Sequence, residues 1–174
     1  VTGAGRGIGR AIARICHDEG ADVAITSRTR SELEETAKNT SMVILPCDLS
    51  EKEQVVLLVK QLQSEWGEEL GHFTLINNAG GSQRKKGTID TLPSSDLEDM
   101  LQLNVVTVHT LTSAVLQVGK PQCIINISSR AAKIGIAGNA FYVASKFALE
   151  GYSATLALEL VGRTTVNTLS PGMV

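Results

Sequence analysis

The stretch that decides the fold is Val1-Thr2-Gly3-Ala4-Gly5-Arg6-Gly7-Ile8-Gly9, a glycine-rich turn between a β-branched pair and a segment of helical periodicity. Its spacing, Gly3-x-x-x-Gly7-x-Gly9, departs from the common G-x-G-x-x-G pattern because Ile8 takes the place of the third glycine. Glycines still permit a tight turn and a close backbone approach to a pyrophosphate, and the following helix offers free N–H groups. A glycine-rich turn of this kind need not bind a ligand, but its position directly after a strand favours a dinucleotide-binding loop.

Working outward from this turn, short β-branched runs alternate with segments of helical period. Strands are predicted at 1–2, 22–26, 42–45, 73–76, 123–127 and 165–169. Helices are predicted at 8–19, 31–39, 50–66, 95–117 and 141–161, the middle three starting at Ser-x-x-Glu capping boxes (Ser31, Ser50 and Ser95). The polar stretch 81–93 is expected to be a solvated loop.

This alternation predicts an α/β fold, a Rossmann-type doubly wound parallel sheet. We expect a single domain over residues 1–174 that is truncated at both ends, so that the C-terminal substrate-loop region lies beyond it. Ligands of such sheets bind beyond the carboxyl ends of the strands, and every motif described below falls at such an end or on the neighbouring helices.

The composition is that of an ordinary soluble globular protein, with 43% hydrophobic and 20% charged residues. A formal net charge of −2 gives no reason to expect nucleic acid or an anionic membrane as a partner, and no apolar run approaches the roughly 20 residues of a membrane span. Cys16, Cys47 and Cys123 are far apart and indicate buried thiols in a reducing compartment, with a redox or metal role as the alternative. We expect no metal site and a cytoplasmic or organelle-matrix location.

The end of the second predicted strand favours NADP(H) over NAD(H). An acid at this place, about 20 residues after the glycine turn, would bind the ribose 2′-hydroxyl of NAD. The sequence has Ser27-Arg28 there, and Arg28 can pair with a 2′-phosphate through a charge-assisted contact. Arg6 lies on the same side. A solvated surface charge is the alternative for Arg28.

Two further features point to proton-transfer chemistry. Tyr142 and Lys146 are four residues apart, hence on one helix face, and an ammonium about 5 Å away favours a phenolate by about 3 kcal/mol at an effective dielectric near 20. Ser128 and Ser129 end a buried strand, where a hydroxyl can donate to a substrate oxygen. By itself, Tyr-x-x-x-Lys arises by chance in many helices, and strand-end serines can be plain turn residues.

Asn104 falls on the apolar stripe of the helix predicted at 95–117. A carboxamide on a core-facing stripe costs free energy unless its donors and acceptors are matched. Asn104 is therefore either a satisfied core residue or a polar group, such as a water relay, held beneath an active site.

Together these motifs resemble the short-chain dehydrogenase/reductase family over essentially the whole chain. The matching features, in the family's order, are the glycine loop 2–9, Asp48 after the third strand, Asn77-Asn78-Ala79-Gly80, Asn104, Ser128-Ser129, Tyr142-x-x-x-Lys146 and Pro171-Gly172.

The resemblance implies a catalytic set. Tyr142 would be the general acid/base, and Lys146 would support it and bind the nicotinamide ribose. Ser129, 13 residues before Tyr142, would orient the carbonyl. Asn104 would hold a water linked to Lys146. The implied cofactor site comprises Gly3, Arg6, Gly7, Ile8, Gly9, Ser27, Arg28, Asp48, Leu49, Asn78, Ala79, Gly80, Tyr142, Lys146, Pro171 and Gly172.

The implied activity is hydride transfer between NADP(H) and a small carbonyl or alcohol substrate. Reduction of a ketone, of 3-oxoacyl or alicyclic type, is the leading expectation, and alcohol oxidation would use the same residues. A homodimer or homotetramer is expected. The alternative is a non-catalytic NADP-binding sensor or scaffold, against which the intact catalytic set argues.

Overall fold

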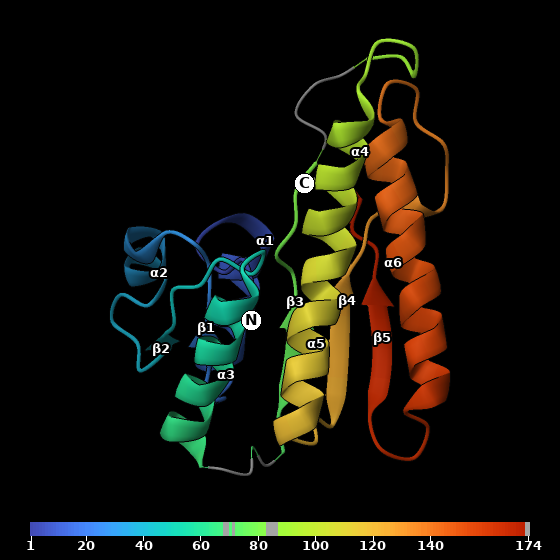
Figure 1. Cartoon of the computed structure of the whole chain (residues 1–174). Helices are drawn as coiled ribbons and strands as arrows, with labels where there is room; N and C mark the ends of the chain where they lie inside the picture. The colour runs from blue at the N-terminus through green and yellow to red at the C-terminus, as the bar shows by residue number, and fades with distance from the viewer. Residues whose placement is uncertain (68–69, 71, 83–86, 173–174) are drawn as a thin grey trace.

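Helices and strands alternate along the chain in a computed structural model that describes residues 1–67, 70, 72–82 and 87–172 (Figure 1). The helices are α1 (Gly7–Asp18), α2 (Arg30–Thr36), α3 (Lys52–Trp66), α4 (Ser94–Leu101), α5 (Thr107–Val118) and α6 (Ala140–Glu159). The strands are β1 (Ala24–Ile25), β2 (Val43–Ile44), β3 (Thr74–Asn77), β4 (Cys123–Ile127) and β5 (Thr165–Leu169). A π-helical turn, Gln102–Val106, joins α4 to α5, and a 3₁₀ turn, Arg130–Ala132, follows β4.

The strands are all parallel and form two groups, β1–β2 and β3–β4–β5. Residues 1–4 join the groups, because the Thr26 N–H donates to the Val1 carbonyl (3.1 Å) and the Thr2 N–H donates to the Ile76 carbonyl (3.0 Å). The resulting order, β2–β1–(1–4)–β3–β4–β5, is that of a doubly wound sheet. The direction of winding reverses between residues 1–4 and β3, which is where such sheets bind their ligands.

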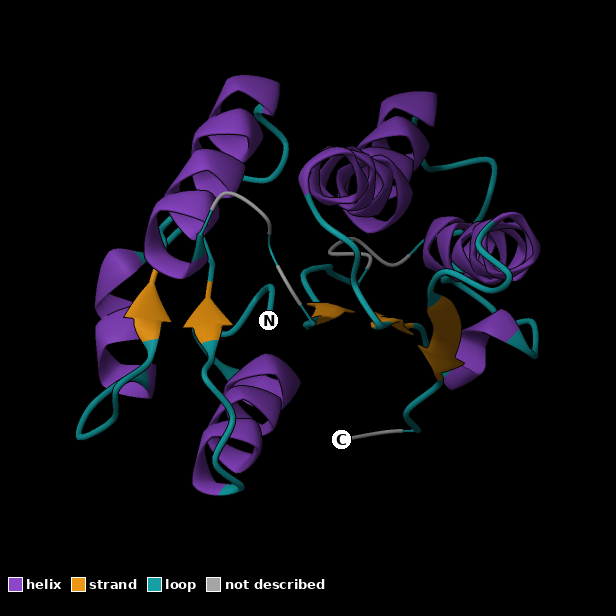
Figure 2. Ribbon diagram, turned by 90° about the horizontal axis from the view of Figure 1, so that it is seen from below, coloured by secondary structure: helices purple, strands orange, loops and turns teal. Residues whose placement is uncertain are grey.

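Helices cover both faces of this sheet (Figure 2). On one face α3, α5 and α6 bury an apolar cluster that includes Leu58, Leu111 and Ile124. On the other, α1 and α2 bury a smaller cluster that includes Ala13 and Leu33. In the part of the chain that the structure describes, no helix combines the length and apolar character needed to cross a membrane.

The predicted fold class is confirmed, and the departures are local. The strand expected at 1–2 forms a single bridge, from Thr2 to Thr26. The helix expected at 95–117 is interrupted by the π turn, in which the backbone gains a residue per turn. Of the solvated loop expected at 81–93, residues 83–86 lie outside the described residues.

The three predicted capping boxes are wrong. The N-caps of α2, α3 and α4 are Thr29, Glu51 and Pro93, and none makes a side-chain capping bond. Ser31 and Ser95 lie inside the first turns of α2 and α4. Ser50 lies one residue before the α3 cap, and its hydroxyl donates to Asp48 Oδ1 instead (2.7 Å).

Candidate active site

The predicted site residues gather at the carboxyl edge of the sheet, around the point where the winding reverses. The glycine loop follows residues 1–2, the segment 78–81 follows β3, Ser128 and Ser129 follow β4, and Pro171 follows β5. Because the carboxyl ends of parallel strands meet at one edge, four separate parts of the sequence come together there.

The glycine loop fits closely against the end of β3. Gly3 has a φ of +62°, and a Cβ there would lie 2.9 Å from the Ala79 Cα. A Cβ on Gly9 would collide with the Gly3 carbonyl and the Asn78 side chain. Glycine is therefore required at position 9 by contact, and at position 3 by contact and by conformation.

The outer side of the same loop is open. Gly7 has a φ of +55°, and a Cβ there would meet nothing within 4 Å. The N-cap of α1 is the exposed Arg6, whose side chain makes no capping bond. The first N–H groups of α1 and its positive dipole end thus face an open glycine turn, as a pyrophosphate site requires.

Thr2 and Asn78 connect the glycine loop to β3. The Thr2 hydroxyl oxygen accepts hydrogen bonds from the backbone N–H groups of Asn78 (2.9 Å) and Ala79 (2.8 Å). The Asn78 side-chain amide donates back to the Thr2 carbonyl (2.9 Å). Thr2 was predicted at the end of the first strand and the start of the glycine loop; its role as a double acceptor depends on β3 lying alongside it.

Tyr142 and Lys146 lie on the same side of α6. Lys146 Nζ is 5.9 Å from the centre of the Tyr142 ring and donates to the Ile127 carbonyl (3.0 Å), directly before the two serines. Lys146 is buried, whereas Tyr142 is half-buried. Burial lowers the pKa of the Lys146 ammonium to about 8.

The two serines differ in their surroundings. Ser128 is buried, next to the Glu150 carboxylate. Ser129 is half-buried, and its Oγ accepts the Ala131 N–H (3.1 Å) as the N-cap of the 3₁₀ turn. The Ser129 hydroxyl keeps its own hydrogen for donation and is accessible, whereas the Ser128 side chain is buried, so Ser129 suits a carbonyl-orienting role better than Ser128.

Asn104 lies in the π turn and is buried. Its Oδ1 accepts the Gly81 N–H (3.0 Å), and its Nδ2 donates to the Gly81 carbonyl (3.0 Å) and to Ser145 Oγ (2.9 Å). Both amide hydrogens therefore have protein acceptors. Of the two alternatives for the Asn104 side chain, these contacts favour the satisfied core residue. The side chain fixes the segment after β3 to the π turn between α4 and α5.

Gly80 joins these groups into one site. A Cβ on Gly80 would lie 2.8 Å from Asn104 Oδ1 and 3.7 Å from Lys146 Nζ. Gly80 follows Ala79, which contacts Gly3, so the glycine loop and the Tyr142–Lys146 pair flank one short segment.

Glu150 of α6, a residue not predicted from the sequence, attaches the end of β5 to that helix. Its carboxylate accepts from Thr168 Oγ1 (3.0 Å) and Ser170 Oγ (2.9 Å) and pairs with Lys133 (3.2 Å). Partial burial opposes its ionisation, yet these contacts leave the pKa of Glu150 below its ordinary value. The Pro171 carbonyl accepts the Arg130 N–H (3.0 Å), which brings it beside Ser129; Gly172 is exposed.

The four residues expected at the adenosine end follow β1 and β2 and lie apart from the Tyr142–Lys146 pair. Ser27 is half-buried and Arg28 is exposed. The pKa of Asp48 is lowered first by the Ser50 hydroxyl bond and also by the charge of Arg28. Leu49 packs against the apolar cluster of α3.

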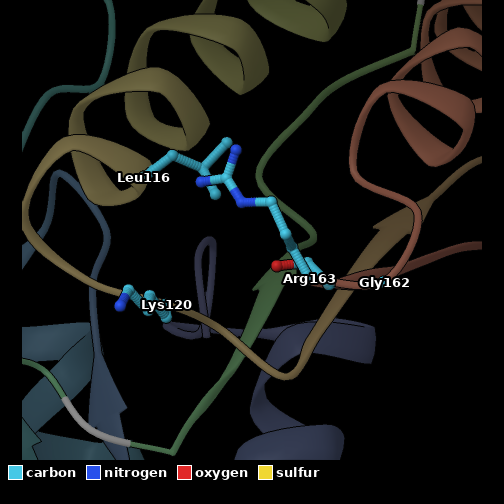
Figure 3. Close-up of a pocket in the computed structure, with 5 residues that line it drawn as sticks. Leu116, Lys120, Gly162 and Arg163 are labelled. Carbon is cyan, nitrogen blue, oxygen red and sulfur yellow. The ribbon is translucent and has the colours of Figure 1, made fainter.

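A cavity of about 320 Å³ lies elsewhere, at the amino ends of β4 and β5 (Figure 3). Leu116, Lys120 and the turn Gly162–Thr164 line it. The motifs above sit at the opposite, carboxyl edge, so this cavity is not the candidate site. Within the described residues, no three His, Cys, Asp or Glu side chains gather where a metal ion could be held.

A doubly wound sheet with a glycine turn at its winding reversal, beside a tyrosine–lysine pair, defines the class of dinucleotide-binding oxidoreductases. The family described as short chain dehydrogenase matches residues 1–174. The chain belongs to this family.

Individual relatives agree with the family. An uncharacterized oxidoreductase of Mycobacterium tuberculosis is 34% identical over 183 residues, covering 100% of this chain and 68% of the relative. The 3-oxoacyl-[acyl-carrier-protein] reductase of Salmonella typhimurium is 33% identical, covering 100% of this chain and 72% of the relative. A crystal structure of an actinorhodin polyketide ketoreductase variant with NADPH has a TM-score of 0.90 and 31% identity, covering 100% of this chain and 69% of that one. Against a short-chain dehydrogenase structure from Streptomyces avermitilis, the chain spans 64% of the solved length.

Proposed function

We propose that this chain binds NADP(H) at the carboxyl edge of its sheet and takes part in reducing a ketone to an alcohol. The observation that carries the proposal is the position of Lys146 Nζ, 5.9 Å from the Tyr142 ring centre and 3.0 Å from the Ile127 carbonyl. Lys146 thus lies next to the serines that end β4 and next to Gly80, which follows the residue in contact with the glycine loop.

The residues present fit a dinucleotide. The open turn at Gly7 and the uncapped start of α1 suit a pyrophosphate, to which Gly3, Arg6, Ile8 and Gly9 also contribute. Ser27 and Arg28 would hold the 2′-phosphate, with Asp48 and Leu49 at the adenine and 78–80 along the adenosine side. Pro171 and Gly172 would contact the nicotinamide. When bound, this group supplies or accepts the hydride.

Residues of this chain transfer the proton and stabilise the charges that the transfer creates. Tyr142 gives its hydroxyl proton to the substrate oxygen during reduction and takes one back during oxidation. The Lys146 ammonium stabilises the phenolate left behind, and with a pKa near 8 it remains mostly charged at pH 7. Ser129 donates a hydrogen bond to the same substrate oxygen as negative charge develops on it.

Asn104 acts in this scheme as a positioning residue. Its carboxamide holds Gly81 and Ser145, which immediately follow Gly80 and precede Lys146 in the sequence. A water linked to Lys146, as the family resemblance implies, would have to bind atoms other than the two amide hydrogens of Asn104.

Relatives support the substrate class and the direction of reaction. The Salmonella relative is named as a 3-oxoacyl reductase, and the ketoreductase structure contains NADPH. A ketone of 3-oxoacyl or alicyclic type is therefore the substrate that we propose. Assembly into a homodimer or homotetramer, and a cytoplasmic or organelle-matrix location, remain predictions.

The test is NADPH oxidation by the full-length protein with a panel of ketones. Tyr142→Phe should lower kcat by about 10²- to 10⁴-fold, because the proton donor is lost, while NADPH binding stays close to that of the wild type. Tyr152→Phe is the matched control: Tyr152 lies on the same helix but faces His109 (3.3 Å), and its loss should leave turnover near the wild-type rate.

Equal rates for the wild type and Tyr142→Phe would contradict the catalytic assignment. NADPH binding without turnover of any ketone or alcohol would favour the sensor or scaffold alternative.

A further inference from the structure

A carboxylate that the sequence analysis did not consider lies at the adenosine end of the candidate site. Glu32 belongs to the first turn of α2 and is half-buried. A Cβ built on Gly5 would lie 2.8 Å from Glu32 Oε2 and 3.0 Å from Ser27 Oγ. The Glu32 carboxylate and the Ser27 hydroxyl therefore border the same point above the glycine loop.

This point corresponds to the ribose 2′ position of a dinucleotide. The pyrophosphate of such ligands lies on the glycine turn, and the 2′ substituent lies at the end of the next strand. Ser27 is that strand end, and Gly5 belongs to the turn. In NAD-binding domains an acid at the strand end accepts a hydrogen bond from the 2′-hydroxyl. Here the strand end has no acid, but α2 delivers one to the same place.

The helix that carries Glu32 is attached to α1 and the glycine loop by several hydrogen bonds. The Thr36 hydroxyl, one helical turn after Glu32, lies 2.9 Å from both the Ala4 and the Glu32 carbonyl oxygens. Arg10 Nε donates to the Gly5 carbonyl (3.0 Å) and to Thr36 Oγ1 (3.1 Å). These contacts hold the last residue of α2 against the glycine loop, and the bond from Thr36 to the Glu32 carbonyl connects that residue to the turn that carries Glu32.

The charges around this point are mixed. Arg28 is exposed, and its charge acts on the Asp48 carboxylate as well as on any ligand. Glu32 adds a second carboxylate, on the side of the glycine loop. A 2′-phosphate placed here would gain attraction from Arg28 and repulsion from Glu32.

We propose that Glu32 determines cofactor preference at the 2′ position. Its carboxylate repels the 2′-phosphate of NADP(H) and accepts a hydrogen bond from the 2′-hydroxyl of NAD(H). The site is therefore less selective for NADP(H) than Ser27-Arg28 alone would make it. This inference rests on the proposed dinucleotide site and refines its cofactor class.

The experiment measures dissociation constants of the full-length protein for NADPH and NADH, and for the fragments adenosine 2′,5′-bisphosphate and AMP. Glu32→Gln should raise the affinity for NADPH and for the bisphosphate on the order of tenfold. The affinity for NADH and AMP should stay the same or fall. Glu32→Lys should extend the change in the same direction, and Arg28→Ala should reverse it.

Glu34→Gln is the matched control. It makes the same change of charge two residues along α2, on the opposite side of the helix, where Glu34 is 56% exposed and pairs with Arg30. Its ratio of NADPH to NADH affinity should equal that of the wild type. The Glu32→Gln effect should also shrink at high ionic strength, because salt screens the repulsion.

The fragments separate this inference from the proposed reaction, because they bind without any chemistry. If Glu32→Gln changes the affinities for phosphorylated and unphosphorylated ligands equally, or if Glu34→Gln has the same effect, the inference is overturned while the dinucleotide site stands. If the wild type binds neither dinucleotide, the proposed function fails and this inference fails with it.

Discussion

At the scale of single residues, burial of the Lys146 ammonium lowers the stability of the folded chain. An ammonium that is 6% exposed, with one carbonyl as its hydrogen-bond acceptor among the described contacts, is costly to bury. That cost appears as a pKa of about 8 in the folded chain, against an ordinary value of 10.5. The unfolded state therefore binds more protons between these two values, and stability rises with pH across this interval.

This predicts a pH-dependent effect of Lys146→Met. At pH 7 the variant is relieved of a buried charge, whereas well above pH 8 the wild-type lysine is already neutral. The free energy of unfolding of the variant, relative to the wild type, should thus fall by about 2 kcal/mol between pH 7 and pH 9.5. Urea denaturation at both pH values measures it.

The exposed Lys120 provides the comparison for this measurement. The stability of Lys120→Met relative to the wild type should stay constant over the same interval. A constant difference for Lys146→Met as well would contradict the assignment of a buried charge.

At the scale of elements, two arginines of α1 attach α2, but only one of them touches the glycine loop. Arg10 bonds the Gly5 carbonyl and Thr36 Oγ1. Arg14, one turn later, bonds the carbonyls of Glu35 (2.8 Å) and Thr36 (3.2 Å) and so satisfies the end of α2. Substituting the two arginines one at a time therefore separates the attachment of α2 from the orientation of the glycine loop.

We predict that Arg10→Met and Arg14→Met each lower the free energy of unfolding by about 1–3 kcal/mol, since each removes charge-assisted hydrogen bonds. Only Arg10→Met should also weaken dinucleotide binding, because only Arg10 orients the Gly5 carbonyl. Thermal denaturation and a fluorescence titration with NADPH give the two readouts. Equal loss of affinity in both variants would show that the loop depends on α2 as a whole.

The same elements explain how far the sequence could predict the structure. β4 and β5 were predicted to the residue, because continuous or alternating β-branched runs are local signals. The place of Glu32 beside the glycine loop could not be predicted, because it depends on side-chain bonds that attach α2 to α1 and to the loop. The π turn was also missed: it inserts one residue into the helix and shifts the apolar stripe by that residue only, too little to see in the sequence pattern.

At the scale of the whole molecule, a chain of buried polar side chains runs through the sheet into the helices. Asn77 of β3 donates to Asn126 Oδ1 (2.9 Å) and to Thr112 Oγ1 of α5 (3.1 Å). Asn126 of β4 then donates to Ser153 Oγ of α6 (2.8 Å). Two strands and two helices thus share one buried network, which is favourable only while every member is paired.

We predict that Asn126→Leu lowers the free energy of unfolding by about 2–4 kcal/mol, because it removes partners of both Asn77 and Ser153. Urea denaturation is the measurement. Asn167→Leu, at an exposed position of β5, makes the same substitution outside the network and should change stability by less than about 0.5 kcal/mol. Comparable losses in the two variants would show that the network adds nothing beyond the sheet itself.

The two hydrogen bonds between the Asn104 carboxamide and the Gly81 backbone have a consequence for amide exchange. Amide protons in surface loops usually exchange with solvent within local fluctuations, but the Gly81 proton is held by a side chain anchored inside a helix. Its exchange should therefore follow the opening of the helix rather than the motion of the loop. The exchange rate of the Gly81 amide proton would thus report how often the segment 80–81, next to Lys146, detaches from Asn104.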